Sequence, residues 1–296
     1  MNILMTGGTG LIGRAFIKRF TEHRYTVLTR SASSRVAGPP DAVTLVNALD
    51  EFETLDDFDA VINLAGEPIM DKRWSENQKQ VICQSRWQTT QQLVELFAAS
   101  STPPSVFLSG SAIGVYGNHG EDPLPEFVPV SVSDFASTIC LEWENIACRA
   151  EPFTRVVLLR TGIVLDACGG ALKKMLLPFK MGVGGRIGNG EQYMSWIHYR
   201  DQIDAMQFLL THESVSGAVN LVAPNPVTNR EFTRSLAKAL GRPALLPMPA
   251  SVLNKLLGES SSLLLDSQRV LPKKLQESGY QFAFSELTPA FSDLLA

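Results

Sequence analysis

The chain has 296 residues, of which 45% are hydrophobic and 19% charged, and its formal net charge is −4 at pH 7. This composition is typical of a globular protein with one large domain and an appendage, or with two modest domains. The acidic balance and the lack of Lys/Arg clusters argue against nucleic acid and membrane surfaces as partners. The four cysteines and four histidines show no metal-ligand spacing. We therefore expect reduced thiols, a cytoplasmic location and no metal site.

Short apolar runs alternate with longer amphipathic segments along the first half of the chain. This alternation is the βαβ rhythm of a parallel sheet. The expected strands are residues 2–5, 25–29, 42–46, 60–64, 106–109 and 155–165, and the expected helices are 11–22, 76–99 and 134–150. The pattern predicts an α/β fold of the Rossmann type, with a doubly wound parallel sheet.

The alternation of strand and helix patterns is lost over residues 166–195. These residues are rich in glycine and are expected to form a loop over a cleft. A helix is predicted over 201–210, with Asp201 as its N-cap. A strand over 219–222 and a helix over 229–240 follow, and the segment beyond Pro243 has short helices. The predicted organisation is a nucleotide-binding domain over 1–165 to which 196–242 return, a cleft loop over 166–195, and a small, mainly helical substrate-side unit over 243–296.

The first strand runs into Thr6-Gly-Gly-Thr-Gly-Leu-Ile-Gly13, and a helix follows. The context of strand, Gly-x-x-Gly-x-x-Gly and helix is typical of dinucleotide binding. Glycines permit the tight turn and the close approach of a pyrophosphate to backbone N–H groups at the helix start. The predicted cofactor contacts here are Gly7, Thr9, Gly10, Leu11, Ile12 and Gly13.

The end of the second strand indicates which dinucleotide is bound. An acidic residue there accepts a hydrogen bond from the ribose of NAD, whereas a cation accommodates the 2′-phosphate of NADP. This chain has Leu28-Thr-Arg-Ser31 at that turn. Thr29 and Arg30, with the hydroxyl of Ser31, favour NADP(H). The alternative is that Arg30 is a solvated surface charge.

Several motifs together resemble the extended short-chain dehydrogenase/reductase (SDR) superfamily over almost the whole chain. They are the glycine turn, Asn63-Leu-Ala-Gly66, Ser111-Ala-Ile-Gly-Val-Tyr-Gly117 and Trp196-Ile-His-Tyr-Arg-Asp201. Further stretches, including Ser85-Arg-Trp and the glycine-rich run to Gly190, are similar to an atypical subgroup of YfcH-like epimerase family proteins. That subgroup is related to NAD-dependent epimerases and dehydratases.

The resemblance implies a set of further site residues. Leu64, Ala65 and Gly66 would contact the adenosine and ribose side of the cofactor. The segment Thr161–Val164 would lie near the nicotinamide, with Val164 as a contact. Arg86, on the long helix after the fourth strand, is a candidate cofactor contact, and the alternative is a solvated arginine.

The catalytic Tyr-x-x-x-Lys pair of the parent superfamily has no counterpart in this chain. The resemblance aligns Phe135 with the tyrosine and Ile139 with the lysine, and none of the five tyrosines is followed four residues later by lysine. Ser111 stands at the position of the family's catalytic serine, and Tyr116 is the nearest candidate acid. Both could instead be a turn hydroxyl and a packed aromatic ring.

Two functions therefore remain open from the sequence. One is an NADP(H)-dependent oxidoreductase or sugar-nucleotide epimerase-like isomerase with a rearranged acid/base set and an unidentified small-molecule substrate. The other is a non-catalytic NADP(H)-binding sensor or regulatory protein. The resemblance also implies a homodimer as one arrangement, formed through the helices over 76–99 and 134–150.

Overall fold

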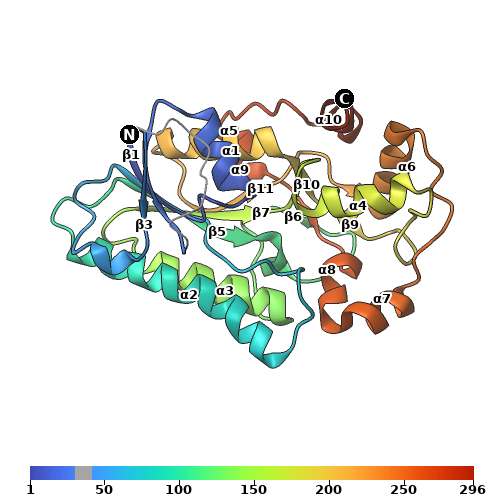
Figure 1. Cartoon of the computed structure of the whole chain (residues 1–296), viewed down its shortest axis with the longest axis horizontal. Coiled ribbons are helices and arrows are strands. Elements are labelled where there is room, and N and C mark those ends of the chain that lie inside the picture. The colour runs from blue at the N-terminus through green and yellow to red at the C-terminus, as the bar shows by residue number, and fades with distance from the viewer. Residues whose placement is uncertain (31–41) are drawn as a thin grey trace.

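Seven parallel strands form the central sheet of the molecule. The structure is a computed structural model that describes residues 1–30 and 42–296 (Figure 1). In the order in which they lie side by side, the strands are β11 (Gly217–Leu221), β7 (Arg155–Thr161), β5 (Val106–Ala112), β4 (Ala60–Asn63), β1 (Asn2–Thr6), β2 (Arg24–Leu28) and β3 (Val43–Val46). The direction of winding reverses between β1 and β4, which makes this the topological switch point where ligands bind in such sheets. The predicted doubly wound Rossmann-type fold is confirmed.

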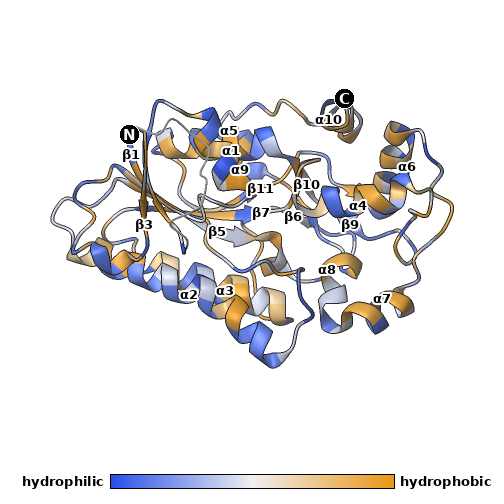
Figure 2. Ribbon diagram, in the orientation of Figure 1, coloured by the Kyte–Doolittle hydropathy of each residue, from blue (hydrophilic) through white to orange (hydrophobic). Residues whose placement is uncertain are grey.

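Helices cover both faces of this sheet. On one face lie α1 (Leu11–Arg19) and α5 (Tyr199–Thr211), and on the other lie α2 (Glu76–Ala99) and α3 (Phe135–Cys148) (Figure 1). Figure 2 shows that α2 carries hydrophilic and hydrophobic residues along its length, as a helix with one covered side does. Among the helices of the described residues, none has both the length and the apolar character to cross a membrane.

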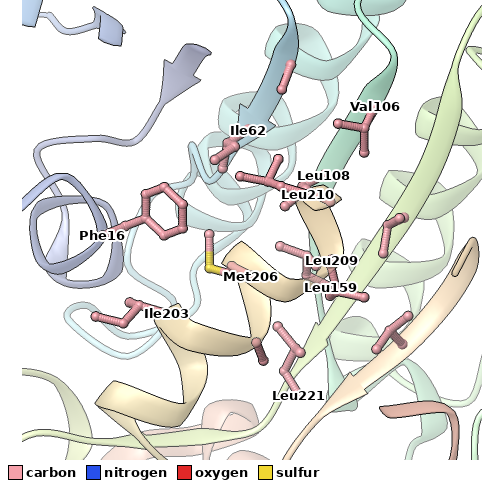
Figure 3. Packing of buried hydrophobic residues seen from close by; sticks show 14 of the residues in the cluster. Phe16, Ile62, Val106, Leu108, Leu159, Ile203, Met206, Leu209, Leu210 and Leu221 are labelled. Carbon is pink, nitrogen blue, oxygen red and sulfur yellow. The ribbon is translucent and has the colours of Figure 1, made fainter. Parts of the chain in front are cut away.

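The core is divided by the sheet into two layers. Successive strand residues point to opposite faces, so Ile62 faces α1 and α5 while its neighbour Val61 faces α2 and α3. Figure 3 shows Phe16 of α1 and Met206 of α5 packed beside Ile62, and all three side chains are fully buried. Burial on both faces explains why the strands read as continuous apolar runs in the sequence.

The segment 166–195 differs from its predicted loop structure because it contains the helix α4 (Gly170–Lys180). Leu172, Leu176 and Phe179 recur at helical spacing and are buried against the C-terminal half of the chain. Glycines on both sides of these residues conceal the periodicity in the sequence. The helix therefore supplies a packed wall where a loop was expected.

The predicted strand over 155–165 is also interrupted. It is broken at Gly162, and its second part, β8 (Ile163–Leu165), pairs with β10 (Trp196–His198) outside the main sheet. A Cβ atom on Gly162 would lie 2.5 Å from the carbonyl oxygen of Ser195, so the crossing of these segments requires glycine.

Asp201 is not the N-cap of α5. That cap is His198, whose Nδ1 accepts a hydrogen bond from the backbone N–H of Arg200 at 3.1 Å. The Asp201 carboxylate instead accepts from the backbone N–H groups of Ala283 and Phe284, at 2.8 and 2.9 Å. This aspartate therefore ties the C-terminal segment to α5, which covers one face of the sheet.

The chain beyond Pro243 is mainly helical, as predicted, and includes one short strand. Its helices are α7 (Ala250–Leu257), α8 (Ser262–Leu265), α9 (Lys273–Glu277) and α10 (Leu287–Leu294), and they follow α6 (Asn229–Leu240). The strand β13 (Arg269–Val270) pairs with β6 (Pro123–Leu124), and β9 (Tyr193–Met194) pairs with β12 (Val227–Thr228). These pairings bring the C-terminal helices beside the carboxyl ends of β5 and β7 (Figure 1).

Candidate functional site

The first strand ends in a turn that only glycine can form. Gly7 has a φ of +70°, and a Cβ atom there would lie 2.5 Å from the carbonyl oxygen of Leu64. A Cβ atom on Gly13 would lie 2.6 Å from the carbonyl oxygen of Gly7. The glycines therefore let β1, the turn and α1 approach one another more closely than side chains would allow.

Helix α1 begins at this turn without a side-chain cap. Its N-cap, Gly10, has extended backbone, and its own N–H donates to the carbonyl of Gly7 at 2.9 Å. Thr9 lies half-buried in the same turn, and Leu11 and Ile12 begin the helix. The first N–H groups of a helix have no intrahelical acceptor and lie at the positive end of its dipole. This helix start can therefore bind an anion such as a pyrophosphate.

A buried polar network holds the end of β4 next to the glycine turn. Thr6 Oγ1 donates to Asn63 Oδ1 at 2.6 Å and accepts from the backbone N–H of Ala65 at 3.2 Å. Asn63 Nδ2 donates to Thr90 Oγ1 of α2 at 2.8 Å. The predicted cofactor segment Leu64–Gly66 is thus fixed at the switch point of the sheet.

Arg86 extends from α2 to the backbone that follows β4. Its guanidinium donates to the carbonyl oxygens of Ile82 and Glu67, each at 3.0 Å, and lies 5.4 Å from the ring centre of Trp143. A Cβ atom on Gly66 would come within 2.8 Å of the guanidinium carbon. Burial lowers the pKa of Arg86. Arg86 therefore stands beside the predicted cofactor segment and holds it in place.

The end of β2 carries the residues predicted to distinguish NADP from NAD. Thr29 is buried, and its backbone N–H donates to the carbonyl of Val46 at 2.9 Å. Arg30 follows and is exposed. Because β2 is the neighbour of β1, Arg30 lies at the same edge of the sheet as the glycine turn. Ser31 lies outside the described residues.

A cavity of about 360 Å³ lies at the carboxyl ends of the strands, between the sheet and the C-terminal segments. This volume is within the range of roughly 300–1,000 Å³ that is usual for small-molecule sites. Leu11 of α1 and the whole predicted segment Thr161–Val164 line it, so the cavity adjoins the glycine turn. The opposite wall comes from Gly170, Ala171 and Met175, from residues 192–195, and from Ser262–Leu264.

Ser111 and Tyr116, the predicted catalytic residues, belong to a buried ion-pair network. Ser111 Oγ donates to Glu144 at 2.6 Å, and Arg160 donates to both oxygens of the same carboxylate, at 2.9 and 2.8 Å. The Tyr116 hydroxyl donates to Asn220 at 2.8 Å and accepts from Arg160 at 3.0 Å. Burial raises the pKa of Tyr116. Since neither residue is among the described residues that line the cavity, this geometry favours a structural role for both.

Apolar packing occupies the two positions that the family resemblance aligns with the catalytic tyrosine and lysine. The ring of Phe135 packs edge-to-face against Trp74, with ring centres 4.9 Å apart. Ile139, one turn further along α3, is 1% exposed and belongs to the same apolar cluster. A lysine at this position would bury its charge.

Two carboxylates that the sequence analysis did not single out as site residues line the cavity, those of Asp134 and Asp266. Asp134 is the N-cap of α3, and its Oδ1 accepts from the backbone N–H of Ser137 at 2.7 Å. Burial, with the negative charge of Asp134, raises the pKa of Asp266. Asp266 lies in a short irregular segment after α8, so no sequence periodicity indicated where it points. The cavity thus holds one carboxylate that caps a helix and one that takes up a proton more readily.

The chain matches the NAD dependent epimerase/dehydratase family over residues 3–222 and a domain of unknown function, DUF1731, over residues 248–294. It is 38% identical over 295 residues to an epimerase family protein of Staphylococcus aureus, which covers 99% of this chain and 98% of that protein. A homologue from Staphylococcus epidermidis is also 38% identical, over 297 residues, with the same coverage.

Solved structures agree with these matches. The human epimerase family protein SDR39U1, solved with NADPH, is 33% identical and covers 99% of both chains with a TM-score of 0.90. A nucleoside-diphosphate sugar epimerase from Corynebacterium glutamicum is 29% identical, with a TM-score of 0.78 over all of this chain and 58% of that one. A UDP-galactose 4-epimerase, at 18% identity and a TM-score of 0.73, shares the fold. The chain therefore belongs to the NAD dependent epimerase/dehydratase family, in which its similarity lies with the atypical epimerase family proteins.

Proposed function

We propose that the chain binds NADP(H) across the turn between β1 and α1. The observation that carries this proposal is the glycine turn: a Cβ atom at Gly7 or Gly13 would collide with neighbouring backbone, so only glycine permits the turn that leads into the uncapped start of α1. The human relative solved with NADPH supports the same cofactor. Arg30, at the end of β2, is the cation predicted to contact the 2′-phosphate of NADP(H). Bound there, NADP(H) would donate or accept a hydride.

We infer that the adjoining cavity is the substrate site. Leu11 and Val164 belong to both the predicted cofactor contacts and the cavity wall, which supports a substrate bound beside the cofactor. The reaction class is that of an NADP-dependent oxidoreductase or an epimerase-like isomerase. Because Phe135 and Ile139 cannot exchange a proton, another group has to do so. Asp266 is the carboxyl in the cavity whose raised pKa suits this task.

The second candidate is a non-catalytic NADP(H)-binding sensor or regulatory protein. The specific observation that favours it is the apolar packing of Phe135 and Ile139 where the parent enzymes carry their acid/base pair. In this case the cavity would bind a regulatory ligand, and the binding of NADP(H) would be the signal that the protein senses.

One experiment separates the two candidates. The full chain is saturated with NADPH and mixed with sets of small carbonyl compounds and sugar nucleotides. Absorbance of the reduced cofactor and chromatography of the products are then followed, so that isomerisation is seen as well as net reduction. Turnover by the wild type that is slower in the Asp266→Asn variant supports the enzyme hypothesis. NADPH binding without turnover of any set supports the sensor, and lack of NADPH binding overturns both.

A further inference from the structure

The cavity wall includes two glutamine side chains whose carbonyl oxygens can accept a hydrogen bond from a ligand. Gln192 is 7% exposed, and its Nε2 donates to the carbonyl oxygens of Ile187 and Leu264, at 3.2 and 3.1 Å. Only the NH₂ group can serve two carbonyls, so these bonds fix the orientation of the amide. The Gln192 carbonyl oxygen has no hydrogen-bond partner among the described residues. This oxygen keeps accessible surface, so a ligand or a water molecule can donate a hydrogen bond to it.

Gln268, on another wall of the same cavity, also presents an unpaired amide oxygen, although its NH₂ group uses only one of its two donors within the described residues. Its Nε2 donates to the carbonyl of Gly117 at 3.1 Å, and within the described part of the chain its side-chain oxygen has no donor. Ser195, between the two glutamines, already donates to the backbone carbonyl of Gln268 at 2.6 Å and accepts from Val270 N–H at 2.9 Å. Its hydroxyl proton is therefore not available to a ligand. The wall thus offers the two glutamine oxygens as acceptors, beside the Tyr193 hydroxyl, which can donate or accept.

The two carboxylates add negative charge to these acceptors. Asp134 is the helix cap described above, whereas the Asp266 carboxylate meets no donor in the part of the chain that the structure describes. Their charges attract an ammonium group and repel a phosphate group. The rest of the wall is largely apolar and includes Ile69, Met175 and Leu263. It therefore suits a ligand with a compact carbon skeleton.

We propose that the cavity binds a compact molecule that presents ammonium or hydroxyl donors to Asp266, Gln192 and Gln268, and that it does not bind a nucleoside diphosphate. This inference deepens the proposed function, on which it rests for the identification of the cavity as the substrate site. The substrate class is thus an amino alcohol, an amine or a polyol. It differs from the nucleotide-linked sugars named for several solved structures that share the fold.

The test compares probes that share a carbon skeleton and differ in charge. Cyclohexylamine, cyclohexanecarboxylate and UDP-glucose are titrated into the full chain at neutral pH, with and without NADPH, and binding is followed by saturation-transfer NMR. We expect the amine to bind at least about tenfold more tightly than the carboxylate, since a hydrogen bond to a charged group is worth that much. The variant Asp266→Asn should reduce this preference several-fold, since the charge of Asp134 remains. The control Asp122→Asn, at an exposed carboxylate outside the cavity wall, should keep it.

The proposal is overturned if UDP-glucose or the carboxylate binds as tightly as the amine, or if Asp266→Asn leaves the ratio unchanged while circular dichroism shows a folded protein. Failure of the proposed function is seen separately, because a parallel titration of the same protein with NADPH measures its cofactor affinity. A protein that keeps the amine preference but does not bind NADPH contradicts the cofactor assignment alone.

Discussion

Gly7 lies so close to Leu64 that a Cβ atom on the glycine would be 2.5 Å from the leucine carbonyl oxygen. This contact joins the carboxyl ends of β1 and β4 at the switch point of the sheet, between which the winding direction reverses. The positive φ of Gly7 and the proximity of Leu64 are both requirements that only glycine meets. The strand spacing and the predicted cofactor turn therefore depend on the same residue.

The variant Gly7→Ala should lower the free energy of unfolding by about 2 kcal/mol or more, because it adds overpacking to an unfavourable φ. It should also weaken NADPH binding at least about tenfold, since the turn must move. Urea unfolding and fluorescence titration measure the two effects.

A matched control is available at Gly120. It also has a positive φ, of +59°, but a Cβ atom there would meet nothing within 4 Å. Gly120→Ala should therefore show the backbone cost alone, about 1 kcal/mol, with unchanged NADPH affinity. Equal losses of stability in both variants would show that the contact with Leu64 has no energetic consequence.

Glu144 and Arg160 form a buried bidentate ion pair, and each side chain is 6% exposed. Glu144→Gln leaves the Arg160 cation buried without its counter-charge, which should lower the free energy of unfolding by about 3–5 kcal/mol. Glu142→Gln, on the same helix outside this network, should change it by less than about 0.5 kcal/mol. Chemical denaturation of both variants and of the wild type measures these differences in the free energy of unfolding. A Glu144→Gln protein as stable as the wild type would remove the structural role assigned to the network that holds Ser111 and Tyr116.

Much of the fold could be predicted from the sequence because its signals are local. Helix α2 has the predicted bounds Glu76–Ala99, and α6 those of the predicted helix 229–240. The glycine turn could be located because strand, turn and helix are consecutive in the chain. By contrast, α4 was missed because the glycines around it conceal its apolar spacing.

The candidate site was harder to predict because its chemistry depends on packing between distant segments. Ser111 and Tyr116 stand at plausible sequence positions, yet their partners Glu144, Arg160 and Asn220 come from other elements, and nothing in the local sequence indicates them. The cofactor contacts inferred from the sequence stay predictions. Asp266 reaches the cavity only because the C-terminal segments fold back beside the sheet.

The raised pKa of Asp266 makes a prediction about stability and pH. Burial and the facing charge of Asp134 raise this pKa in the folded protein, so the proton is bound more tightly there than in the unfolded chain. The contribution of Asp266 to the free energy of unfolding is fully present below the ordinary pKa of aspartate. It is lost as the pH rises through the pKa that Asp266 has in the folded protein. Asp266→Asn should therefore be more stable than the wild type at neutral pH and equally stable at low pH, as thermal melts across pH would show. A stability difference that does not vary with pH would contradict the raised pKa.

Arg30 is expected to select the phosphorylated cofactor. Arg30→Asp should weaken NADPH binding at least about tenfold through loss of a charge-assisted contact, with a smaller change for NADH. Arg24→Asp makes the same charge change at the amino end of β2, away from the glycine turn, and should leave both affinities unaltered. Equal weakening of NADPH and NADH by Arg30→Asp would show that Arg30 does not contact the 2′-phosphate.

The central claim, that the glycine turn and the end of β2 form an NADP(H) site, is tested most directly by titrating the wild-type chain with NADPH and NADH and following cofactor fluorescence. We predict saturable binding of one NADPH per chain, with an affinity at least about tenfold higher than that for NADH. Equal affinities would contradict the assignment to NADP(H), and a chain that binds neither dinucleotide would contradict the site itself.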